Sequence, residues 1–267
     1  MTKLECKLRF KKDGNDFKEI DIDSNIYRKI EGRIRDVNEN TDINISEYEE
    51  NREIIIENFL NEDKKVNDVC RYILTREGRY YTRSDNQKTI KNSDYKDDIV
   101  KSNENIKSII IILESPHQYE YNDKFEPKAP AQGKTGEGIE FYIELIIYHL
   151  IKREGITLDD DKYNVIICNP VQYQASLYHL HNNSIEGKYK TLRNNVWKKL
   201  FDDETKKDFI DRVKSYKPKL IINACTSDLK DCVQEELYKE FSQSSDVEMI
   251  KSYHPSSWGC LGIEVKK

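Results

Sequence analysis

Three polar residues directly follow apolar, strand-like runs of the chain and carry side chains that can do chemistry on a ligand. They are Glu114, Asn169 and His254. A carboxylate can hold a water molecule or stabilise a cation, an imidazole can give or take a proton, and an amide presents both a donor and an acceptor. Each of the three residue types also occurs as an ordinary turn, capping or core residue.

The apolar run before Glu114 has the composition of a strand in a parallel sheet. Residues 109–113 are apolar throughout and mostly β-branched, which is typical of a strand buried on both faces. Strand-like and helix-like segments alternate from there on, which predicts a parallel sheet with helices on both faces. Because the carboxyl ends of parallel strands share one edge, the three polar residues are expected to face one pocket. The expected strands are 109–113, 163–168, 220–224 and 247–253, and the expected helices are 138–153, 194–201, 206–216 and 229–241.

A loop of small residues, 130–138, precedes the first of these helices. Its glycines allow close backbone approach, and the N-terminus of the helix offers free N–H groups to an anion such as a phosphate. Gly133, Lys134 and Thr135 spell the end of a Walker loop, but Lys128 stands where that loop requires glycine, and no strand directly precedes it. A nucleotide-binding P-loop is therefore not expected.

Residues 1–105 are polar and rich in charge, and we interpret them as an N-terminal accessory region before a catalytic domain at 106–267. The pattern predicts a strand at 4–10 and helices at 26–34, 46–60 and 66–74, the second with a capping box of Ser46 and Glu49. Arginine and tyrosine interleave after residue 76. That segment is either a grip for nucleic acid or a solvated loop or β-hairpin.

The composition narrows the class of protein. No apolar run approaches the length needed to span a bilayer, and the first six residues do not resemble a secretory n-region, so we expect a cytoplasmic protein with no membrane partner. We also expect a monomer. The 6 cysteines form no CxxC pair, so we expect no metal site, disulfide framework or cofactor. The net charge of -5 counts mildly against a DNA partner, although a local basic groove would be invisible in the total.

Four motifs, in order, resemble those of the uracil-DNA glycosylase superfamily. Residues 113–117, Leu-Glu-Ser-Pro-His, resemble its Gly-Gln-Asp-Pro-Tyr-His or Gly-Glu-Ala-Pro-Gly turn, and residues 130–136 resemble its Pro-Phe-x-Gly-x-x-Gly loop. Asn169 matches the asparagine that ends the second strand, and residues 254–258 resemble His-Pro-Ser-Pro-Leu. The resemblance covers roughly residues 109–258. It implies a three-layer α/β/α fold with a central four-stranded parallel sheet, here with an N-terminal α+β extension.

The resemblance also implies a role for each polar residue in cleavage of an N-glycosidic bond. His254 would donate a hydrogen bond to the pyrimidine O2 as the base leaves, and Asn169 would identify the base. Ser115 occupies the position of the water-activating Asp of the best-known branch and cannot replace an anionic base. Glu114 coincides with the Glu of the Gly-Glu-Ala-Pro-Gly branch and would position water or stabilise the oxocarbenium ion. The cysteines do not match the iron-sulfur ligands of that branch, so no cluster is expected.

Two departures from the superfamily bear on the substrate. Ala131 replaces the Phe that stacks on uracil, and His117 replaces the Tyr that excludes a 5-methyl group. A base larger than uracil could then enter, with a ring from Tyr119, Tyr121 or Phe125 as a substitute. The expected base pocket comprises Ser115, Pro116, His117, Ala131 and Gln132. The expected DNA contacts are Gly133, Lys134, Thr135, Gly136, Ser256, Ser257 and Trp258, with Trp258 as the wedge that enters the duplex.

We therefore expect a DNA glycosylase that flips out a pyrimidine and leaves an abasic site. Its substrate would be uracil or, more in keeping with the enlarged pocket, a bulky modified pyrimidine such as the hydroxymethylated or glucosylated cytosine of viral DNA. Some members of the superfamily act in bacterial defence in that way. Two alternatives stay open: a nucleic-acid-binding module of the same fold that lost catalysis, motivated by Ser115, and an unrelated α/β hydrolase of nucleotides.

Overall fold

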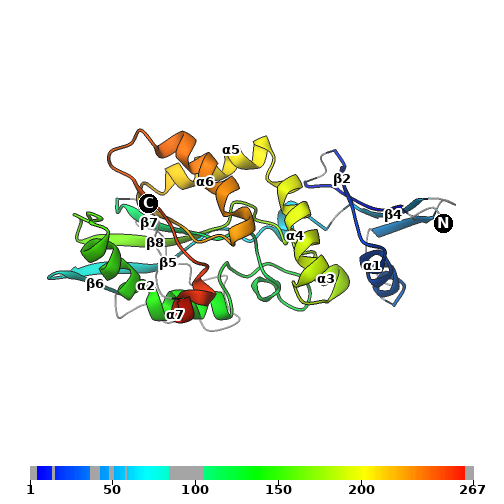
Figure 1. Ribbon diagram of the computed structural model, residues 1–267, viewed down its shortest axis with the longest axis horizontal. Helices are drawn as coiled ribbons and strands as arrows, with labels where there is room; N and C mark the ends of the chain where they lie inside the picture. The colour runs from blue at the N-terminus through cyan, green and yellow to red at the C-terminus, as the bar shows by residue number, and fades with distance from the viewer. Residues whose placement is uncertain are drawn as a thin grey trace.

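The computed structural model describes residues 5–13, 16–36, 43–47, 51–57, 59–83 and 105–261. Two sheets follow one another along the long axis of the molecule (Figure 1). The larger has six strands in the order β10-β9-β7-β8-β5-β6, and the smaller has four in the order β2-β1-β4-β3. Helices α4, α5 and α6 lie on one face of the six-stranded sheet, and α2 and α7 lie on the other (Figure 1). The protein thus has a mixed α/β fold with a central sheet flanked by helices.

Four adjacent strands of the larger sheet, β10, β9, β7 and β8, are parallel, as the sequence predicts. All five residues of the central strand β7 are buried, because its side chains alternate between two apolar cores. Ile110 and Ile112 pack on one side, and Ile109 and Ile111 pack on the other. The bounds are β7 Ser108–Ile112, β8 Lys162–Cys168, β9 Pro218–Asn223 and β10 Glu248–Lys251.

The four predicted helices of this region are also confirmed. Helix α2 begins at Lys134 rather than at residue 138, so half of the small-residue loop is helical. Helix α5 starts with Asp202 as N-cap, whose side chain accepts from the backbone N–H of Thr205. The bounds are α2 Lys134–Arg153, α3 Tyr178–His181, α4 Gly187–Leu200, α5 Asp203–Ser215, α6 Ser227–Phe241 and α7 Trp258–Leu261, with 3-10 turns η1 Glu62–Lys64, η2 Gln118–Glu120 and η3 Pro255–Ser257.

The smaller sheet confirms two predictions for the N-terminal region and corrects a third. The strand predicted at 4–10 and the helix predicted at 26–34 are present, but the helix predicted at 46–60 is wrong. The isoleucines on which that prediction rested lie in a strand, with Ile54 and Ile56 buried and Ile55 partly exposed. Consecutive β-branched residues favour that strand over the helix. The elements are β1 Glu5–Phe10, β2 Lys18–Asp21, α1 Ser24–Asp36, β3 Ile43–Glu47 and β4 Asn51–Ile56.

Two further strands widen the larger sheet from within the region assigned to the N-terminal extension. Strand β5, Val69–Glu77, pairs antiparallel with β8, so the helix predicted at 66–74 is wrong. Strand β6, Tyr80–Arg83, forms a hairpin with β5 through Gly78, whose φ is 63°. The Arg and Tyr segment after residue 76 is therefore a hairpin up to residue 83, and residues 84–104 lie outside the described part of the chain. The domain boundary at 105 does not coincide with an edge of the sheet.

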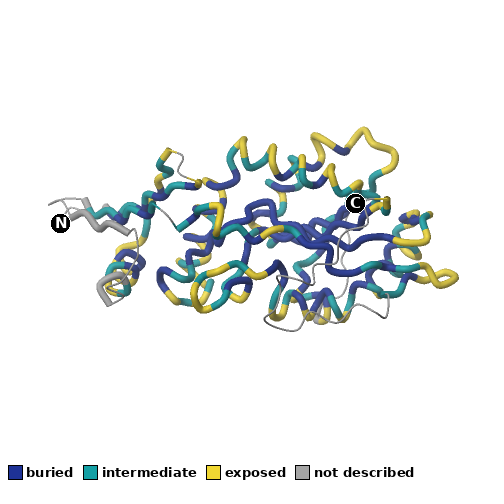
Figure 2. Tube along the Cα trace, turned by 180° about the vertical axis from the view of Figure 1, so that it is seen from behind, coloured by how far each residue is buried: buried dark blue, intermediate teal, exposed yellow. Residues whose placement is uncertain are grey.

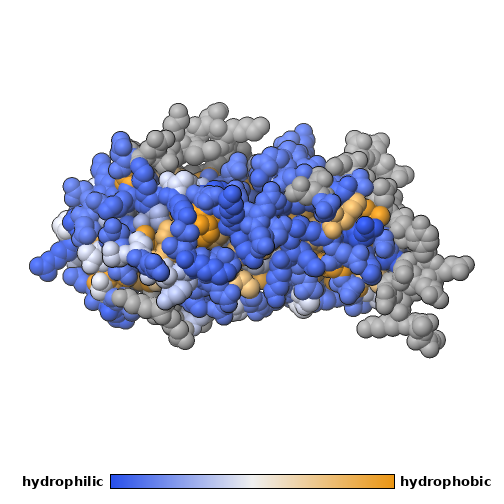
Figure 3. Space-filling model, turned by 90° about the horizontal axis from the view of Figure 1, so that it is seen from above, coloured by the Kyte–Doolittle hydropathy of each residue, from blue (hydrophilic) through white to orange (hydrophobic). Residues whose placement is uncertain are grey.

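Burial is concentrated along the strands of the larger sheet, while the outer faces of the helices are exposed (Figure 2). The face seen from above in Figure 3 carries mostly hydrophilic side chains, with apolar residues only in small patches. Among the described residues, no helix is both long and apolar enough to cross a membrane.

Candidate functional site

The carboxyl ends of the parallel strands are tied together by backbone hydrogen bonds. Leu113 N donates to Cys168 O at 2.9 Å, and Val171 N donates to Glu114 O at 3.3 Å. On the other side, the backbone N–H of Ala224 donates to the carbonyl of Ile112 at 2.9 Å. The turns after β7, β8 and β9 therefore lie next to one another at one edge of the sheet.

Glu114 is a buried carboxylate held by two helices. Its Oε1 lies 2.5 Å from Nη1 of Arg193 in α4, and its Oε2 accepts from the backbone N of Thr226 at 2.9 Å, just before α6. The indole Nε1 of Trp197 donates to the carbonyl of Glu114 at 2.7 Å. Only 7% of Glu114 is exposed. The arrangement fixes a negative charge at the sheet edge, which suits the stabilisation of a developing cation.

His254 follows β10 and is oriented by the turn that comes after it. Its Nδ1 accepts from the backbone N of Ser256 at 3.4 Å and lies 2.9 Å from Ser256 Oγ. An accepting Nδ1 places the proton of the neutral ring on Nε2, so we assign Nε2–H as a donor. Burial lowers the pKa of His254, and the nearby charge of Glu114 partly opposes that shift. The imidazole is therefore neutral at neutral pH.

His117 is a second neutral imidazole beside the first. Its Nδ1 accepts from the backbone N of Tyr119 at 3.5 Å. Burial lowers the pKa of His117, the proximity of His254 lowers it further, and Glu114 raises it. Glu114, His117 and His254 are therefore close enough to influence one another's charge, which brings together residues of the first and the last predicted motif.

Asn169 is completely buried, with 0% exposure. Its backbone N donates to Oδ1 of Asp68 at 3.2 Å, and its carbonyl accepts from Nη2 of Arg212 at 3.2 Å. Neither the Oδ1 nor the Nδ2 of its side chain has a hydrogen-bond partner among the described residues. An unpartnered buried amide is costly, about 1–3 kcal/mol for each polar group. The side chain of Asn169 is thus buried and anchored through its backbone, and both of its polar atoms are unpaired among the described residues.

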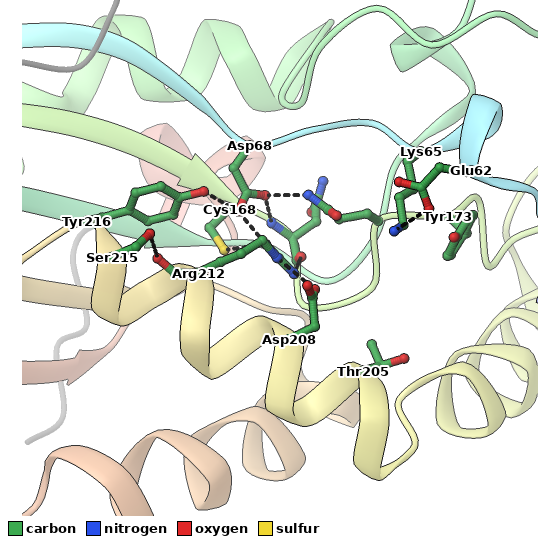
Figure 4. Close-up of polar contacts among 12 residues, drawn as sticks. Glu62, Lys65, Asp68, Cys168, Tyr173, Thr205, Asp208, Arg212, Ser215 and Tyr216 are labelled. Atoms are coloured by element: carbon green, nitrogen blue, oxygen red, sulfur yellow. Dashed lines mark hydrogen bonds and ion pairs between the residues drawn. The ribbon is translucent and has the colours of Figure 1, made fainter. Parts of the chain in front are cut away.

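The anchor of Asn169 is an ion pair between Asp68, the residue before β5, and Arg212 of α5, drawn in Figure 4. The Asp68 side chain is 2% exposed and pairs with Nη1 of Arg212, and it also accepts from Tyr216 Oη at 3.0 Å and from Gln172 Nε2 at 3.3 Å. A second carboxylate, Asp208, bonds Nε of Arg212 at 2.8 Å from the exposed side. These hydrogen bonds and ion pairs fix the position of the end of β8, where Asn169 lies.

The small-residue loop before α2 is fixed by two buried side chains, Arg71 and Glu120. Arg71 Nη1 donates to the carbonyls of Pro130 and Ala131 at 3.1 and 2.8 Å, and the N–H of Ala131 donates to Oε1 of Glu120 at 2.8 Å. Burial raises the pKa of Glu120 to about 8. Ala131 is buried with φ 60°. In the next turn a Cβ on Gly136 would overlap the Ala131 carbonyl.

The loop also packs against the turn that carries His254. A Cβ on Gly138 would overlap the carbonyl oxygen of Pro255, so glycine is needed for α2 to approach η3. Two groups of predicted DNA contacts are therefore neighbours on one surface. Gly136 and Trp258 are buried, and the other predicted contacts in these two groups are exposed or partly exposed, namely Gly133, Lys134, Thr135, Ser256 and Ser257.

The predicted role of Trp258 as a wedge is wrong. The ring is 2% exposed and belongs to the core beneath α2. Its Nε1 donates to Ser252 Oγ at 2.9 Å and to the carbonyl of Tyr253 at 2.8 Å. Trp258 thus stabilises the turn around His254, because its ring packs in the core while its indole N–H donates hydrogen bonds to that turn.

Two cavities adjoin the site. One, of about 430 Å³, is lined by aromatic and amide side chains that include Tyr119, Tyr121 and Gln132. The other, of about 100 Å³, lies beyond Asn169, beside Pro170 and Arg212. Neither of these two cavities is lined by Glu114, Asn169 or His254, so a cavity shared by those three side chains stays a prediction.

No family model, curated protein or solved structure matches this chain. The site therefore has to be interpreted from its own geometry. Within the described residues, no group of three or more His, Cys, Asp and Glu side chains is arranged to hold a metal ion.

Sequence reasoning missed the charged residues that position the site. Arg193 and Arg212 come from helices that otherwise look like solvated surface, and Asp68 comes from a segment predicted to be helical. A signal was present in α4, where Arg193 is flanked by Leu192 and lies on the same face as Val196 and Trp197. A charge on the apolar face of a helix is buried only when it has a partner.

Proposed function

We propose that this protein is a DNA glycosylase of the uracil-DNA glycosylase type, which flips out a pyrimidine and hydrolyses its N-glycosidic bond to leave an abasic site. The observation that carries the proposal is the buried amide of Asn169, whose two polar atoms have no partner in the part of the chain that the structure describes. A donor and an acceptor fixed side by side match the donor and acceptor on the edge of a pyrimidine. Binding the base would remove the cost of leaving both groups unpaired.

His254 and Glu114 supply the two electrostatic functions that this reaction needs. The base leaves as an anion, and Nε2–H of the neutral His254 would donate to the oxygen on which that charge develops. The sugar gains oxocarbenium character, and the carboxylate of Glu114 would stabilise that positive charge. Both oxygens of Glu114 already accept strong hydrogen bonds, which favours an electrostatic role over proton abstraction from water.

The surface beside these residues suits the phosphates that flank a flipped nucleotide. The exposed Lys134 begins the 20-residue helix α2, which packs at Gly138 against the turn that carries the exposed Ser256. Phosphate oxygens accept from Lys, Ser and backbone N–H groups and are attracted to a helix N-terminus. These groups support a DNA contact on this surface although the net charge of the chain is -5.

The substrate is uracil or, in our preferred form of the proposal, a bulkier modified pyrimidine such as hydroxymethylated or glucosylated cytosine. The small side chain of Ala131 is buried where the superfamily has a stacking Phe, and His117 stands where it has the excluding Tyr. Action on such bases in viral DNA would make the protein part of an antiviral defence.

A second candidate is a nucleic-acid-binding module of the same fold that lost catalysis. It is favoured by the paired state of Glu114, whose contacts with Arg193 and Thr226 also fit a structural ion pair, and by Ser115 at the position of the usual Asp. Such a module would bind DNA and release no base.

The test is to incubate the protein with single- and double-stranded oligonucleotides that carry uracil, hydroxymethyluracil or glucosylated hydroxymethylcytosine, and then to cleave abasic sites with alkali. The proposal predicts strand breaks on at least one substrate and a loss of several orders of magnitude in Asn169→Ala and His254→Ala. Binding without breaks on every substrate would support the inactive module. Hydrolysis of free nucleosides or nucleotides alone would point to a nucleotide hydrolase.

A further inference from the structure

The cavity of about 430 Å³ lies beside the candidate site and not inside it. The turn after β7 and the loop before α2 form one wall, and α3 forms the other. Three of its lining residues are aromatic, namely Tyr119, Tyr121 and Tyr178. Its volume is within the range of about 300–1,000 Å³ that small-molecule sites occupy.

Two polar groups of the cavity are suited to bonding a ligand. The Nε2 of Gln132 is buried and has no acceptor among the described residues. Across the cavity, Nδ1 of His179 lies 3.0 Å from Oε1 of Gln174, and the backbone N–H of His179 donates to the same oxygen at 3.1 Å. That oxygen is an acceptor, so Nδ1 carries the proton and Nε2 of His179 is left as an acceptor.

The electrostatics of the cavity favour a neutral ligand. Burial lowers the pKa of His179 to about 4, so the ring is uncharged at neutral pH. Lys128 and Asp123 both line the cavity, and their charges offset each other. A phosphate would find one cation and one anion there, whereas a flat, neutral ring with hydrogen-bonding edges would find aromatic walls, a donor and an acceptor.

Tyr119 connects this cavity to the candidate site. Its ring is 57% exposed, covers Gly133 and lies 5.1 Å from the ring of His117, measured between centroids. The charges of His254 and Glu114 in turn shift the pKa of His117, so these three residues are neighbours. The cavity is therefore one side chain away from the residues that would act on the target base.

We propose that this cavity binds a second nucleobase, that of a nucleotide next to the target base in an unpaired strand. The inference rests on the proposed function and specifies its substrate class: single-stranded or locally opened DNA. Stacking on exposed aromatic side chains is how proteins hold unpaired bases, and the free edge of such a base can bond Gln132 and His179. In an intact duplex the neighbouring base is paired and stacked, and it is not free to enter.

The test measures binding of fluorescein-labelled, unmodified oligothymidine by fluorescence anisotropy, so it needs no cleavage. Tyr119→Ala is expected to weaken binding of the single strand by about fivefold to 150-fold, the loss typical for one stacking contact. Binding of the matched duplex should stay unchanged. Tyr238→Ala is the control, since Tyr238 is also a largely exposed tyrosine, at 62%, but lies on α6 away from the cavity.

A second variant tests recognition of the base edge. Gln132→Leu keeps the size of the side chain and removes the donor, so it should alter the relative affinities for oligothymidine, oligocytidine and oligoadenosine strands. Unchanged affinity for single strands in both variants would overturn the proposal, as would an equal loss in Tyr238→Ala. An effect of Tyr119→Ala confined to DNA with a large substituent on the target base would also overturn it, because the cavity would then hold that substituent.

These outcomes are separable from those of the proposed function. Normal base release by a wild-type protein whose single-strand affinity does not depend on Tyr119 would refute the cavity proposal alone. Tyr119-dependent binding of single strands without release of any base would refute the glycosylase proposal and leave the cavity as a base-binding site.

Discussion

The backbone N–H of Asn169 donates to Oδ1 of Asp68 at 3.2 Å, and the carboxylate of Asp68 also pairs with Arg212. A buried ion pair therefore holds a residue whose own side chain has no hydrogen-bond partner within the described ranges. Arg212 completes the arrangement by donating to the Asn169 carbonyl. The backbone of Asn169 is thus fixed by Asp68, which directly precedes β5, and by Arg212 of α5.

Basic side chains from helices also bond a residue after β7 and a residue after β10. Arg193 of α4 bonds Glu114 after β7, and Lys230 of α6 donates to the carbonyl of Ser252 after β10 at 2.5 Å. Each of the three helices on this face of the sheet thus contributes one cation to one strand end. Rigid elements therefore support the candidate residues, as a preorganised site requires.

Replacing Asp68 by Asn should destabilise the protein strongly. The change leaves the Arg212 guanidinium buried with only Asp208 as its anionic partner, and we expect a loss of about 3 kcal/mol in the free energy of unfolding. Asp208→Asn is the matched control, because that carboxylate is 53% exposed and its loss should cost at most about 1 kcal/mol. Urea unfolding followed by circular dichroism measures both, and equal losses would argue against the ion pair as the anchor of Asn169.

Gly138→Ala should separate α2 from the turn that carries His254. The added Cβ overlaps the Pro255 carbonyl, and backbone cannot yield without moving η3. We expect a lower melting temperature and reduced activity. Gly32→Ala serves as the control, because Gly32 also lies within a helix but has open space around its Cβ, and there alanine should stabilise by up to about 1 kcal/mol. A Gly138→Ala protein as stable as the wild type would contradict the close packing.

Glu120→Gln should change how stability depends on pH. The pKa of Glu120 is raised in the folded protein to about 8, so the folded state holds a proton that the unfolded state releases. Stability is therefore full below the unfolded pKa of about 4.3 and falls as pH rises toward 8. Glutamine mimics the protonated carboxyl, so the variant should exceed the wild type in unfolding free energy at pH 8 and show little difference at pH 4. Parallel pH profiles for the two proteins would refute this assignment.

The pH profile of base release should report His254. Burial lowers its pKa, so the imidazole is neutral at neutral pH and the rate should fall only on the acid side. The charge of Glu114 raises that pKa, so Glu114→Gln should lower the rate and also shift the acid limb to lower pH. Measurement of kcat between pH 5 and 8 checks both effects. An acid limb that stays in place in Glu114→Gln would mean that the two residues are not coupled.

The sequence predicted the part of the fold that local patterns determine. Buried parallel strands have continuous apolar runs, so β7 and its neighbours and the polar residues after them could be located. Strand β5 was mistaken for a helix because its identity depends on pairing with β8, which is distant in the chain. The buried positions of Arg212 and Trp258 likewise depend on tertiary contacts that no local pattern contains.

The central claim is that the amide of Asn169 binds a pyrimidine that the protein then releases from DNA. Its most direct test is mass spectrometry of the free bases released from DNA containing modified pyrimidines, for the wild type and for a folded Asn169→Ala variant. The account predicts that one pyrimidine base appears in equal amount to the abasic sites, and that the variant releases almost none. Release of no base from any DNA, or equal release by the variant, would contradict it.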